Sequence, residues 1–396
     1  MIQYTVARTP SGRARERGLS LVELLVALFI GLLLLTAVVQ VFSSSTRTSR
    51  FQQALSRVQE TGRYAVDRIQ SDFRMAGYQG CGGSNTNIGD YRGANAESFS
   101  DQFRDGVQGF QVKSGNNGVD IVDEDGNSLS KPPFNQSGLI SPKPGTGGLL
   151  VNRVTPTDVV FDDTDPPALD IKSGNRSQFD KCDVVLMEGP ECGQARVFIA
   201  GSSSNSAKMN IAGTGSGNSG GGNSGNSGGG NSGNSGGTCG VGNIQALNNQ
   251  NNLNQLSEPW PGDTEDARAL RTQRIVYYIN DSQGETALYR WIGNGQGDGS
   301  SEELVKGVER IHIEYGESTA VPDDSVDVYR DLSAVTDWSD VLSARISIVA
   351  RSATDHVTDE PQTVTFPPGG NNTFTPNDHR LRKVFTTTVA FRNRLP

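Results

Sequence analysis

One apolar segment near the N-terminus limits what this chain can be. From Leu19 to Phe42 the sequence LSLVELLVALFIGLLLLTAVVQVF runs for 24 residues with a single charge, that of Glu23. At about 1.5 Å per residue, a helix of this length spans roughly 36 Å, which is enough to cross the hydrocarbon layer of a membrane. We therefore predict a transmembrane helix over residues 19–42.

The charges on either side of this segment differ in sign. Residues 1–18 carry a net charge of +3, whereas the whole chain carries −9, so the part after Gly18 carries −12. A basic leader is typical of the cytoplasmic flank of a membrane helix. An acidic body without a stripe of Lys and Arg gains nothing from phosphates, which argues against nucleic-acid binding.

An ordinary cleaved signal peptide is the alternative for this segment, with an apolar core over 24–39 and cleavage near 43–45. The apolar run is long for that role and lacks an A-x-A site. An acid deep in a membrane costs about 2.5–3.5 kcal/mol, so we expect Glu23 to face a partner. The alternative for Glu23 is an interfacial residue that reaches the headgroups.

The helical pattern continues beyond the apolar segment. No proline occurs between Leu19 and Ala76, and Gly77 is a suitable helix terminator. Apolar or small residues recur every three to four positions at Phe51, Leu55, Val58, Gly62, Ala65, Ile69, Phe73 and Ala76. We predict that residues 43–77 form the amphipathic half of one nearly continuous helix, packed on a globular domain. A coiled-coil stalk is the alternative.

Residues 78–396 have the pattern of a β-rich head. Eleven short β-type runs are separated by Gly, Asn, Asp and Pro, at 107–112, 119–122, 149–154, 158–161, 183–187, 195–200, 274–279, 287–292, 308–315, 344–350 and 384–391. The runs at 274–279 and 287–292 predict a hairpin closed through NDSQG, with Tyr289 and Trp291 against the preceding strand. Arg and Lys around the last run suggest an edge strand. The expected fold class is α+β, with an antiparallel β-rich head.

A Gly-, Ser- and Asn-rich interval interrupts the head. Residues 213–237 repeat roughly every eight positions without an apolar side chain to bury. We expect residues 202–238 to form a flexible insert.

Four cysteines, at positions 81, 182, 192 and 239, predict two disulfides if the head is exported. In a hairpin of 183–187 and 195–200, Cys182 and Cys192 lie at opposite ends and cannot bridge. The favoured pairs are Cys182 with Cys239, at the base of the insert, and Cys81 with Cys192. This pairing is one of the three connectivities that four cysteines allow.

No pattern in the sequence indicates an enzyme, a cofactor or a metal site. His312, His356 and His379 are scattered, and His312 alternates with isoleucines as a solvent-facing strand residue would. Asp123, Asp125 and Asn127 differ in spacing from a calcium loop and predict a plain turn. Trp338 is expected to be a core residue.

The basic leader, Gly18, an apolar residue and Glu23 together resemble the class III signal of type IV prepilins and pseudopilins. The resemblance implies that a prepilin peptidase cuts between Gly18 and Leu19, that the new amine of Leu19 is methylated, and that the helix is retained. It also implies that Glu23 pairs with the N-terminal amine of a neighbouring subunit, so that two charges neutralise each other on assembly.

Further stretches resemble the PilW group of minor pilins, among them RMAGYQGCGG, IVYYINDSQGETALYR and RLRKVFTTTVAFRN. This implies a low-abundance subunit that joins other minor pilins and the major pilin, primes assembly from the inner membrane, and sits at the pilus tip with a PilY-type adhesin, in support of twitching motility and adhesion. The head would face the periplasm of a Gram-negative bacterium before assembly. The alternatives are a J-type pseudopilin of type II secretion and a membrane-anchored binding module.

Overall fold

A computed structural model describes residues 20–81, 87–90, 106–115, 118–122, 142–163, 168–190, 192–201, 207–211, 266–293, 299–319, 325–331, 334–335, 340–370 and 373–391. The chain divides into two compact units, residues 1–53 and 54–396. Helix α1 (Leu21–Phe73) contributes its first part to the first unit and its last turns to the second. The Gly-rich insert, Trp338, Cys239 and the predicted turn at 123–127 lie outside the described residues.

Helix α1 has 53 residues and ends three residues earlier than the pattern predicts. Residues 74–77 form a turn in which Gly77 adopts a φ of 68°. The amide of Gly77 donates a hydrogen bond of 3.0 Å to the carbonyl oxygen of Asn152. Glycine therefore ends this helical segment, as expected, because it adopts the left-handed conformation without a steric penalty.

The second unit contains seventeen strands among the described residues. They are β1 (Asn87–Asp90), β2 (Val107–Gly115), β3 (Gly118–Val122), β4 (Gly147–Asp163), β5 (Ala168–Ser173), β6 (Val184–Glu188), β7 (Gln194–Ile199), β8 (Lys208–Asn210), β9 (Ala267–Ser282), β10 (Glu285–Gly293), β11 (Gly299–Lys306), β12 (Val308–Glu317), β13 (Val328–Arg330), β14 (Val341–Arg351), β15 (Val364–Thr365), β16 (Thr373–Phe374) and β17 (Arg382–Ala390). All eleven predicted runs fall on strands, so the predicted α+β class with a β-rich head is confirmed.

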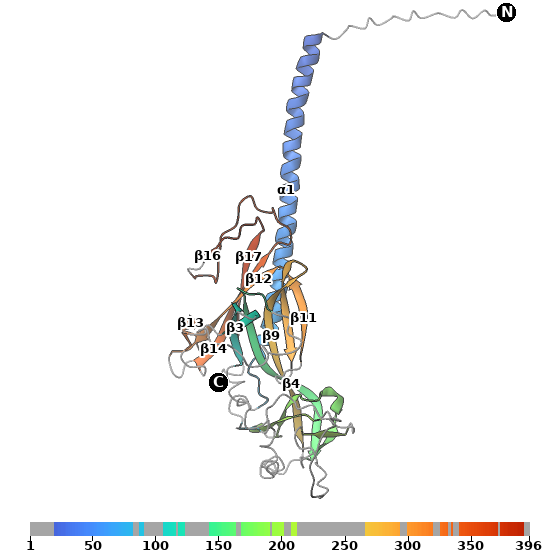
Figure 1. The fold of residues 1–396 in the computed structure, drawn as a ribbon, viewed down its shortest axis with the longest axis vertical. Coiled ribbons are helices and arrows are strands. Elements are labelled where there is room, and N and C mark those ends of the chain that lie inside the picture. Colours follow the sequence, from blue (N-terminus) through green and yellow to red (C-terminus); the bar gives the residue numbers. More distant parts are fainter. Residues whose placement is uncertain are drawn as a thin grey trace, which may run out of the picture. The chain divides into compact units, whose positions relative to one another are not determined.

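An eleven-stranded sheet has the order β1-β7-β6-β9-β4-β2-β3, with β10 and β11 added beside β9, and β5 and β8 added beside β4. Its two longest strands, β4 and β9, pair along most of their length. The sequence suggested two short strands where β4 is continuous, because Pro156 interrupts the pattern. The ladder shifts register between Pro156 and Val160, which accommodates the proline. Figure 1 shows β5 to β8 gathered around the far ends of these two strands.

A hairpin joins β9 and β10 as predicted, although its turn is tighter than expected. Ser282 pairs with Glu285, which leaves a two-residue loop of Gln283 and Gly284 with φ values of 52° and 83°. Positive φ at both loop positions matches the right-handed twist of the two strands. Tyr289 stacks on Tyr278 with ring centroids 5.5 Å apart, so the predicted cross-strand packing is confirmed.

A second sheet has the order β13-β12-β14-β17, which places β17 at an edge. The expectation that basic residues guard this edge is wrong for Arg382. Its side chain is buried and donates hydrogen bonds to Glu309 and Asp378. The two remaining strands, β15 and β16, pair with each other.

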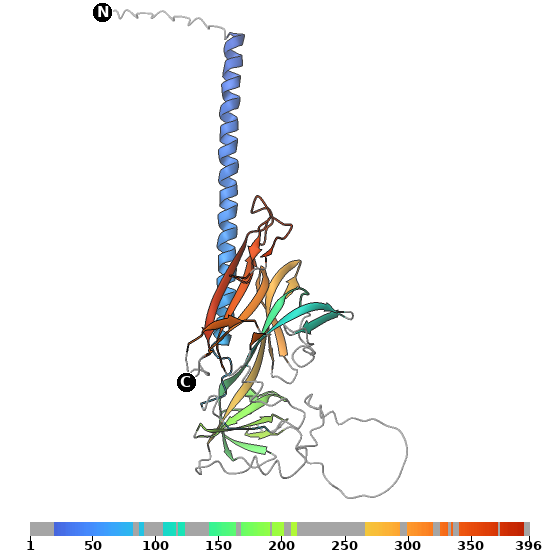
Figure 2. The same ribbon diagram turned by 90° about the vertical axis from the view of Figure 1, so that its left-hand side faces the viewer.

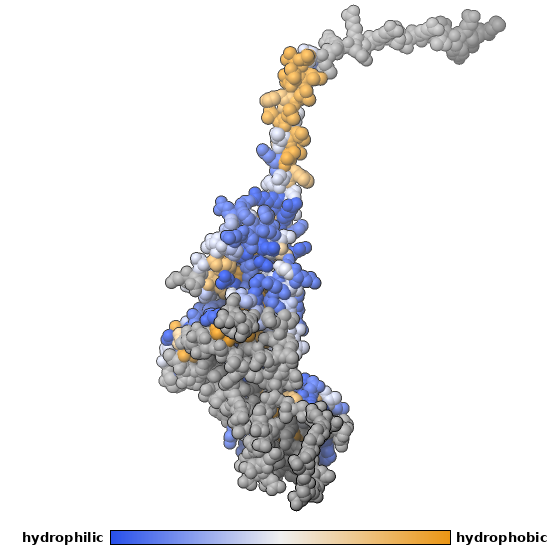
Figure 3. Space-filling model, viewed as in Figure 1, coloured by the Kyte–Doolittle hydropathy of each residue, from blue (hydrophilic) through white to orange (hydrophobic). Residues whose placement is uncertain are grey.

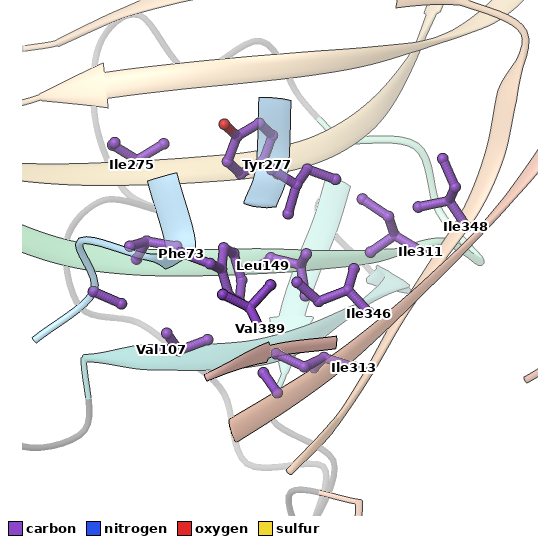
Figure 4. Close-up of a cluster of buried hydrophobic side chains, with 14 of the residues drawn as sticks. Phe73, Val107, Leu149, Ile275, Tyr277, Ile311, Ile313, Ile346, Ile348 and Val389 are labelled. Carbon is purple, nitrogen blue, oxygen red and sulfur yellow. The ribbon is translucent and has the colours of Figure 1, made fainter. Parts of the chain in front are cut away.

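The main core lies between the last turns of α1 and the inner faces of both sheets. Figure 4 shows Phe73 of α1 among Leu149, Ile275, Ile346 and Val389, which come from four different strands. Both ribbon views place these turns beside β9, β12 and β17 (Figures 1 and 2). A separate cluster around Phe161, Phe198 and Met209 fills the region of β5 to β8.

One pairing departs from the predicted antiparallel head. Strand β1 pairs with β7 in parallel, with Asn87 opposite Gln194. A four-residue strand that contains two glycine or asparagine residues has no β-type sequence pattern, so the sequence did not reveal it.

Candidate assembly site: the N-terminal helix and its anchor

The first half of α1 exposes a continuous apolar surface. Large apolar side chains from Leu21 to Phe42 are all exposed within this chain, and Figure 3 shows the orange hydrophobic atoms gathered along that segment. By length and composition, α1 is the one helix within the described residues that is able to span a membrane. The hydroxyl of Thr36 donates a hydrogen bond of 2.8 Å to the carbonyl oxygen of Leu33, so this polar side chain has a partner inside the helix.

Glu23 lies in the first turn of α1 and is exposed. Its amide donates a hydrogen bond of 3.0 Å to the carbonyl oxygen of Ser20, which helps to form that turn. A carboxylate at the N-terminal end of a helix is favourable, because the peptide dipoles place partial positive charge there. Gly18 and Leu19, the predicted cleavage and methylation positions, lie outside the described residues.

Small residues follow Glu23 along one face of the helix. Ala27 and Gly31 come four and eight positions later, and a shallow groove runs over these three residues and the neighbouring leucines. No atom lies within 4 Å of the position that a Cβ at Gly31 would take. Small side chains let a second helix approach closely in a membrane.

The second half of α1 docks on the sheets through the predicted stripe, with two differences. Val58, Gly62, Ala65, Ile69, Phe73 and Ala76 are buried as predicted, together with Ala54 and Asp72. Phe51, which the pattern placed in the stripe, is 38% exposed, and it lies in the first unit. The amphipathic pattern therefore gave the correct face of the helix but missed a buried acid within it.

Asp72 connects α1 to three strands. Its Oδ1 lies 2.9 Å from Nη1 of Arg153 on β4, and its Oδ2 lies 2.8 Å from Nη2 of Arg290 on β10. Tyr277 on β9 donates its hydroxyl hydrogen bond to the same carboxylate. Glu302 adds a carboxylate 3.2 Å from Nη1 of Arg290. Because two charges and a hydroxyl satisfy Asp72, its burial at 2% exposure is tolerated.

Burial and the charge of Asp72 also change the ionisation of its neighbours. Burial is the main cause that raises the pKa of Tyr277, followed by the negative charge of Asp72 and the hydrogen bond to it. Burial lowers the pKa of Arg153, and the charge of Asp72 opposes that change. Tyr277 therefore stays a neutral donor, and the contribution of its raised pKa to stability is present below pH 10 and lost above it.

This anchor was not predicted from the sequence, although one feature of the sequence could have revealed it. Asp72 lies seven positions after Ala65, a spacing of two helical turns, so it falls on the buried stripe. Its partners Arg153 and Arg290 lie on strands far apart in the sequence. Only the paired positions of β4, β9 and β10 bring these side chains to one point.

A disulfide joins Cys81, just after α1, to Cys192 at the β6–β7 hairpin. This is the pair that the hairpin placement favoured. Cys182, at the other end of the hairpin, is also disulfide-bonded, and its predicted partner Cys239 lies outside the described residues. The amide of Cys81 donates a hydrogen bond to the buried Glu188, so the connection after the helix is tied to β6 in two ways.

The histidines do not lie where the sequence placed them. His356 and His379 stack with ring centroids 5.3 Å apart, so they are not scattered. His312 is half-buried, with Nε2 3.0 Å from Asp331, and does not face open solvent. Within the described ranges, no three His, Cys, Asp or Glu side chains gather closely enough to hold a metal ion.

Two family models match the chain, one near each end. A family model for the prokaryotic N-terminal methylation motif matches residues 13–39, which include Gly18, Leu19 and Glu23. A family model described as type IV pilus-assembly protein W (PilW) matches residues 276–393, from the end of β9 to the C-terminal edge strand.

Among solved structures, a type IV-like pilin from Thermus thermophilus is similar over 32% of this chain and 70% of its own length, with 18% identity and a TM-score of 0.22. No curated protein matches the chain.

Proposed function

We propose that this chain acts as a PilW-type minor pilin of the type IV pilus, which primes filament assembly in the inner membrane and then sits in the tip complex; the two family models that match near its ends support this proposal. In this role it joins other minor pilins and the major pilin, and it supports twitching motility and adhesion. A prepilin peptidase cuts after Gly18, and Leu19 becomes the methylated N-terminus.

The observation that carries the proposal is an exposed carboxylate at the start of an exposed apolar helix. In a single subunit in the membrane, Glu23 has no partner charge. The new N-terminal amine of a neighbouring pilin subunit, which corresponds to that of Leu19 here, has no partner charge either. When the two charges pair, the free-energy cost of holding each one in the membrane falls for both. Ala27 and Gly31 leave space along the same face for the helix that brings the amine.

The mechanism is packing rather than catalysis. The apolar half of α1 bundles with the helices of other pilins, and Glu23 sets the register of the bundle. The head comprises residues 54–396 and is held to the end of α1 by the main core and by Asp72. A head of this size suits a position at the end of a filament better than repetition along it. A PilY-type adhesin is the proposed partner beyond the tip.

Glu23→Ala tests the assembly step. We expect the variant to be processed and inserted like the wild type but to be absent from sheared pili. Thr36→Ala is the matched control, because it removes a polar side chain from the same helix without removing a charge, and it should assemble normally. Glu23→Asp should recover part of the incorporation. Normal incorporation of Glu23→Ala would contradict the charge pairing.

Deletion of the gene tests the wider role. We expect twitching motility and surface piliation to fall together, and immunogold label on the protein to lie at pilus ends. Loss of exoprotein secretion with intact pili would instead indicate a type II secretion pseudopilin. Label spread evenly along pili would contradict the tip position.

A further inference from the structure

A cleft of about 840 Å³ opens where the start of β4 and strand β2 meet the outer face of β12. This volume lies within the range of small-molecule sites. The carbonyl oxygen of Ile311 lies 2.6 Å from the position that a Cβ at Gly147 would take, so the two sheets touch closely at the cleft floor. None of the groups that line it belongs to the assembly helix.

Strand β12 supplies the polar wall. Ile311 and Ile313 are buried in the main core. The alternation of a β-strand therefore turns Arg310, His312 and Glu314 to the opposite face, where all three line the cleft. Three ionisable side chains in a row on a half-buried surface are more than the solubility of a strand requires.

The two carboxylates of the cleft already have partners. Arg345 donates two hydrogen bonds to Glu314, of 2.8 and 2.7 Å, and its guanidinium stacks 4.2 Å above the ring of Tyr329. The hydrogen bond to Glu314 raises the pKa of Arg345. Asp331 lies 3.0 Å from Nε2 of His312. These pairs fix the side chains in place and leave lone pairs and N–H groups at set positions.

Two cationic side chains in the cleft, Arg310 and Lys113, have no carboxylate partner among the described residues. The guanidinium of Arg310 stacks 4.0 Å from the ring centroid of Phe374, which holds it in position. Lys113 lines the cleft from β2 and is exposed. Within the described part of the chain, no carboxylate forms an ion pair with either side chain. A chain with a net charge of −9 thus keeps two uncompensated positive charges in one cleft.

The remaining walls are mainly apolar side chains and backbone, with the polar residues Gln111 and Thr146 between them. Phe366 and Pro367 form one side, next to His312, whose ring lies 6.1 Å from that of Phe366. Gly145 and Gly369 line the cleft with positive φ, and nothing lies within 4 Å of the position of a Cβ at either residue. The backbone is therefore open to close approach there.

We propose that this cleft binds an acidic saccharide, a sugar ring that carries a carboxylate. Arg310 and Lys113 receive the carboxylate, because charge-assisted hydrogen bonds from these groups are strong and directional. The fixed pairs Arg345–Glu314 and His312–Asp331 bind the hydroxyl groups, since each hydroxyl both donates and accepts a hydrogen bond. Phe366 and Pro367 contact the apolar face of the ring. The proposal holds wherever the subunit sits in a filament.

Isothermal titration calorimetry on the processed full-length protein in detergent micelles tests the site. Trigalacturonic acid is the probe. We expect saturable binding that weakens as NaCl rises from about 50 mM to about 500 mM, because salt screens the exposed charges. Galactotriose, which lacks the carboxylates, should bind at least about tenfold more weakly. Triglutamate, which has carboxylates but no sugar ring, should also bind more weakly.

The variant Arg310→Gln/Lys113→Gln should weaken trigalacturonate binding at least about tenfold while its unfolding temperature stays that of the wild type, because both residues are exposed. Lys181→Gln, an exposed residue outside the cleft, is the matched control and should bind normally. Equal binding of galactotriose, unchanged binding by the double variant, or no binding at millimolar concentration would overturn the proposal. Tighter binding of triglutamate would show a site for acidic peptides and would overturn it too.

Discussion

Asp72 of α1 and Arg290 of β10 form an ion pair of 2.8 Å in which both side chains are almost wholly buried, with exposures of 2% and 4%. Arg153 and Tyr277 bind the same carboxylate from two neighbouring strands. The hydrophobic effect is non-directional, whereas four polar groups that meet at one point add hydrogen bonds that require one geometry. Asp72 therefore fixes how the last turns of α1 pack on the sheets.

Removal of this acid should destabilise the head strongly. In Asp72→Ala, Arg153 and Arg290 lose their common counter-charge and Arg290 keeps only the exposed Glu302, and breaking a buried ion pair in this way costs about 3–5 kcal/mol. Urea unfolding of the full-length protein, followed by the fluorescence of the buried Trp291, measures this change. Asp67→Ala is the matched control, because Asp67 is exposed on the same helix, and it should change stability by less than about 0.5 kcal/mol. Similar losses in both variants would show that Asp72 is not an anchor.

Gly62 should not tolerate a large side chain. A Cβ at this position would overlap the ring of Phe385 on β17, so even alanine forces the ring to move. We expect Gly62→Leu to cost about 1–3 kcal/mol, because overpacking displaces the helix from the sheet. Ser56→Leu, on the exposed side of the same helix, is the control and should cost little. Thermal unfolding of both variants separates a loss of packing from a change in helix propensity. Equal unfolding temperatures for the two variants would contradict close docking at Gly62.

The strands of the head and the helix face that packs on it could be predicted from the sequence, whereas the side-chain contacts between distant elements could not. The stripe from Val58 to Phe73 and the eleven β-type runs depend on local periodicity, which the sequence contains. The partners of Asp72 lie 81 to 218 residues away in the sequence, and no periodicity encodes such distances. His356 and His379 illustrate the same limit, because hydrogen bonds from the amides of Val357 and Thr358 to the carbonyl oxygen of His379 bring these two distant segments together.

The cleft was missed for a different reason. The sequence shows that Arg310, His312 and Glu314 alternate with isoleucines, and alternation alone predicts a solvent-facing row. The structure covers that row with the segment around Phe366 and Phe374 and places β2 beside it. Whether a polar row faces water or a cavity depends on what packs over it, and this is a tertiary property.

The Cys81–Cys192 disulfide should stabilise the junction after α1. It closes a loop of 111 residues, and the chain-entropy model gives about 5 kcal/mol for a loop of this size. We expect the double variant Cys81→Ser/Cys192→Ser to unfold at lower urea concentration and to lose amide protection at β1. Protection in β12 and β14, which lie in the other sheet, serves as the internal control and should persist below the unfolding transition. An unchanged midpoint would mean that the pairings of β1 and β6 suffice to hold this junction.

Asp378 should make the stability of the head depend on acid pH. Arg382 donates two hydrogen bonds to it, of 2.6 and 2.8 Å, and these are the main cause that lowers the pKa of Asp378 to about 2. The unfolded chain protonates this carboxyl near its ordinary value of about 4. A folded-state pKa below the unfolded one stabilises the protein above the unfolded value, and this contribution is lost as pH falls from about 4 to about 2. We therefore expect Asp378→Asn to be less stable than the wild type at pH 7 by up to about 2 kcal/mol, which is less than the roughly 2.7 kcal/mol of two pKa units at 1.36 kcal/mol each because solvent screens this partly exposed carboxyl. The two proteins should approach each other as pH falls to about 2 and converge below it, where the wild type has lost the same charge. Unfolding temperatures measured from pH 7 to pH 2 test this, with Asp67→Asn as the exposed control that should follow the wild type throughout. Parallel curves for Asp378→Asn and the wild type would mean that Glu309, which also binds Arg382, is sufficient to hold that guanidinium.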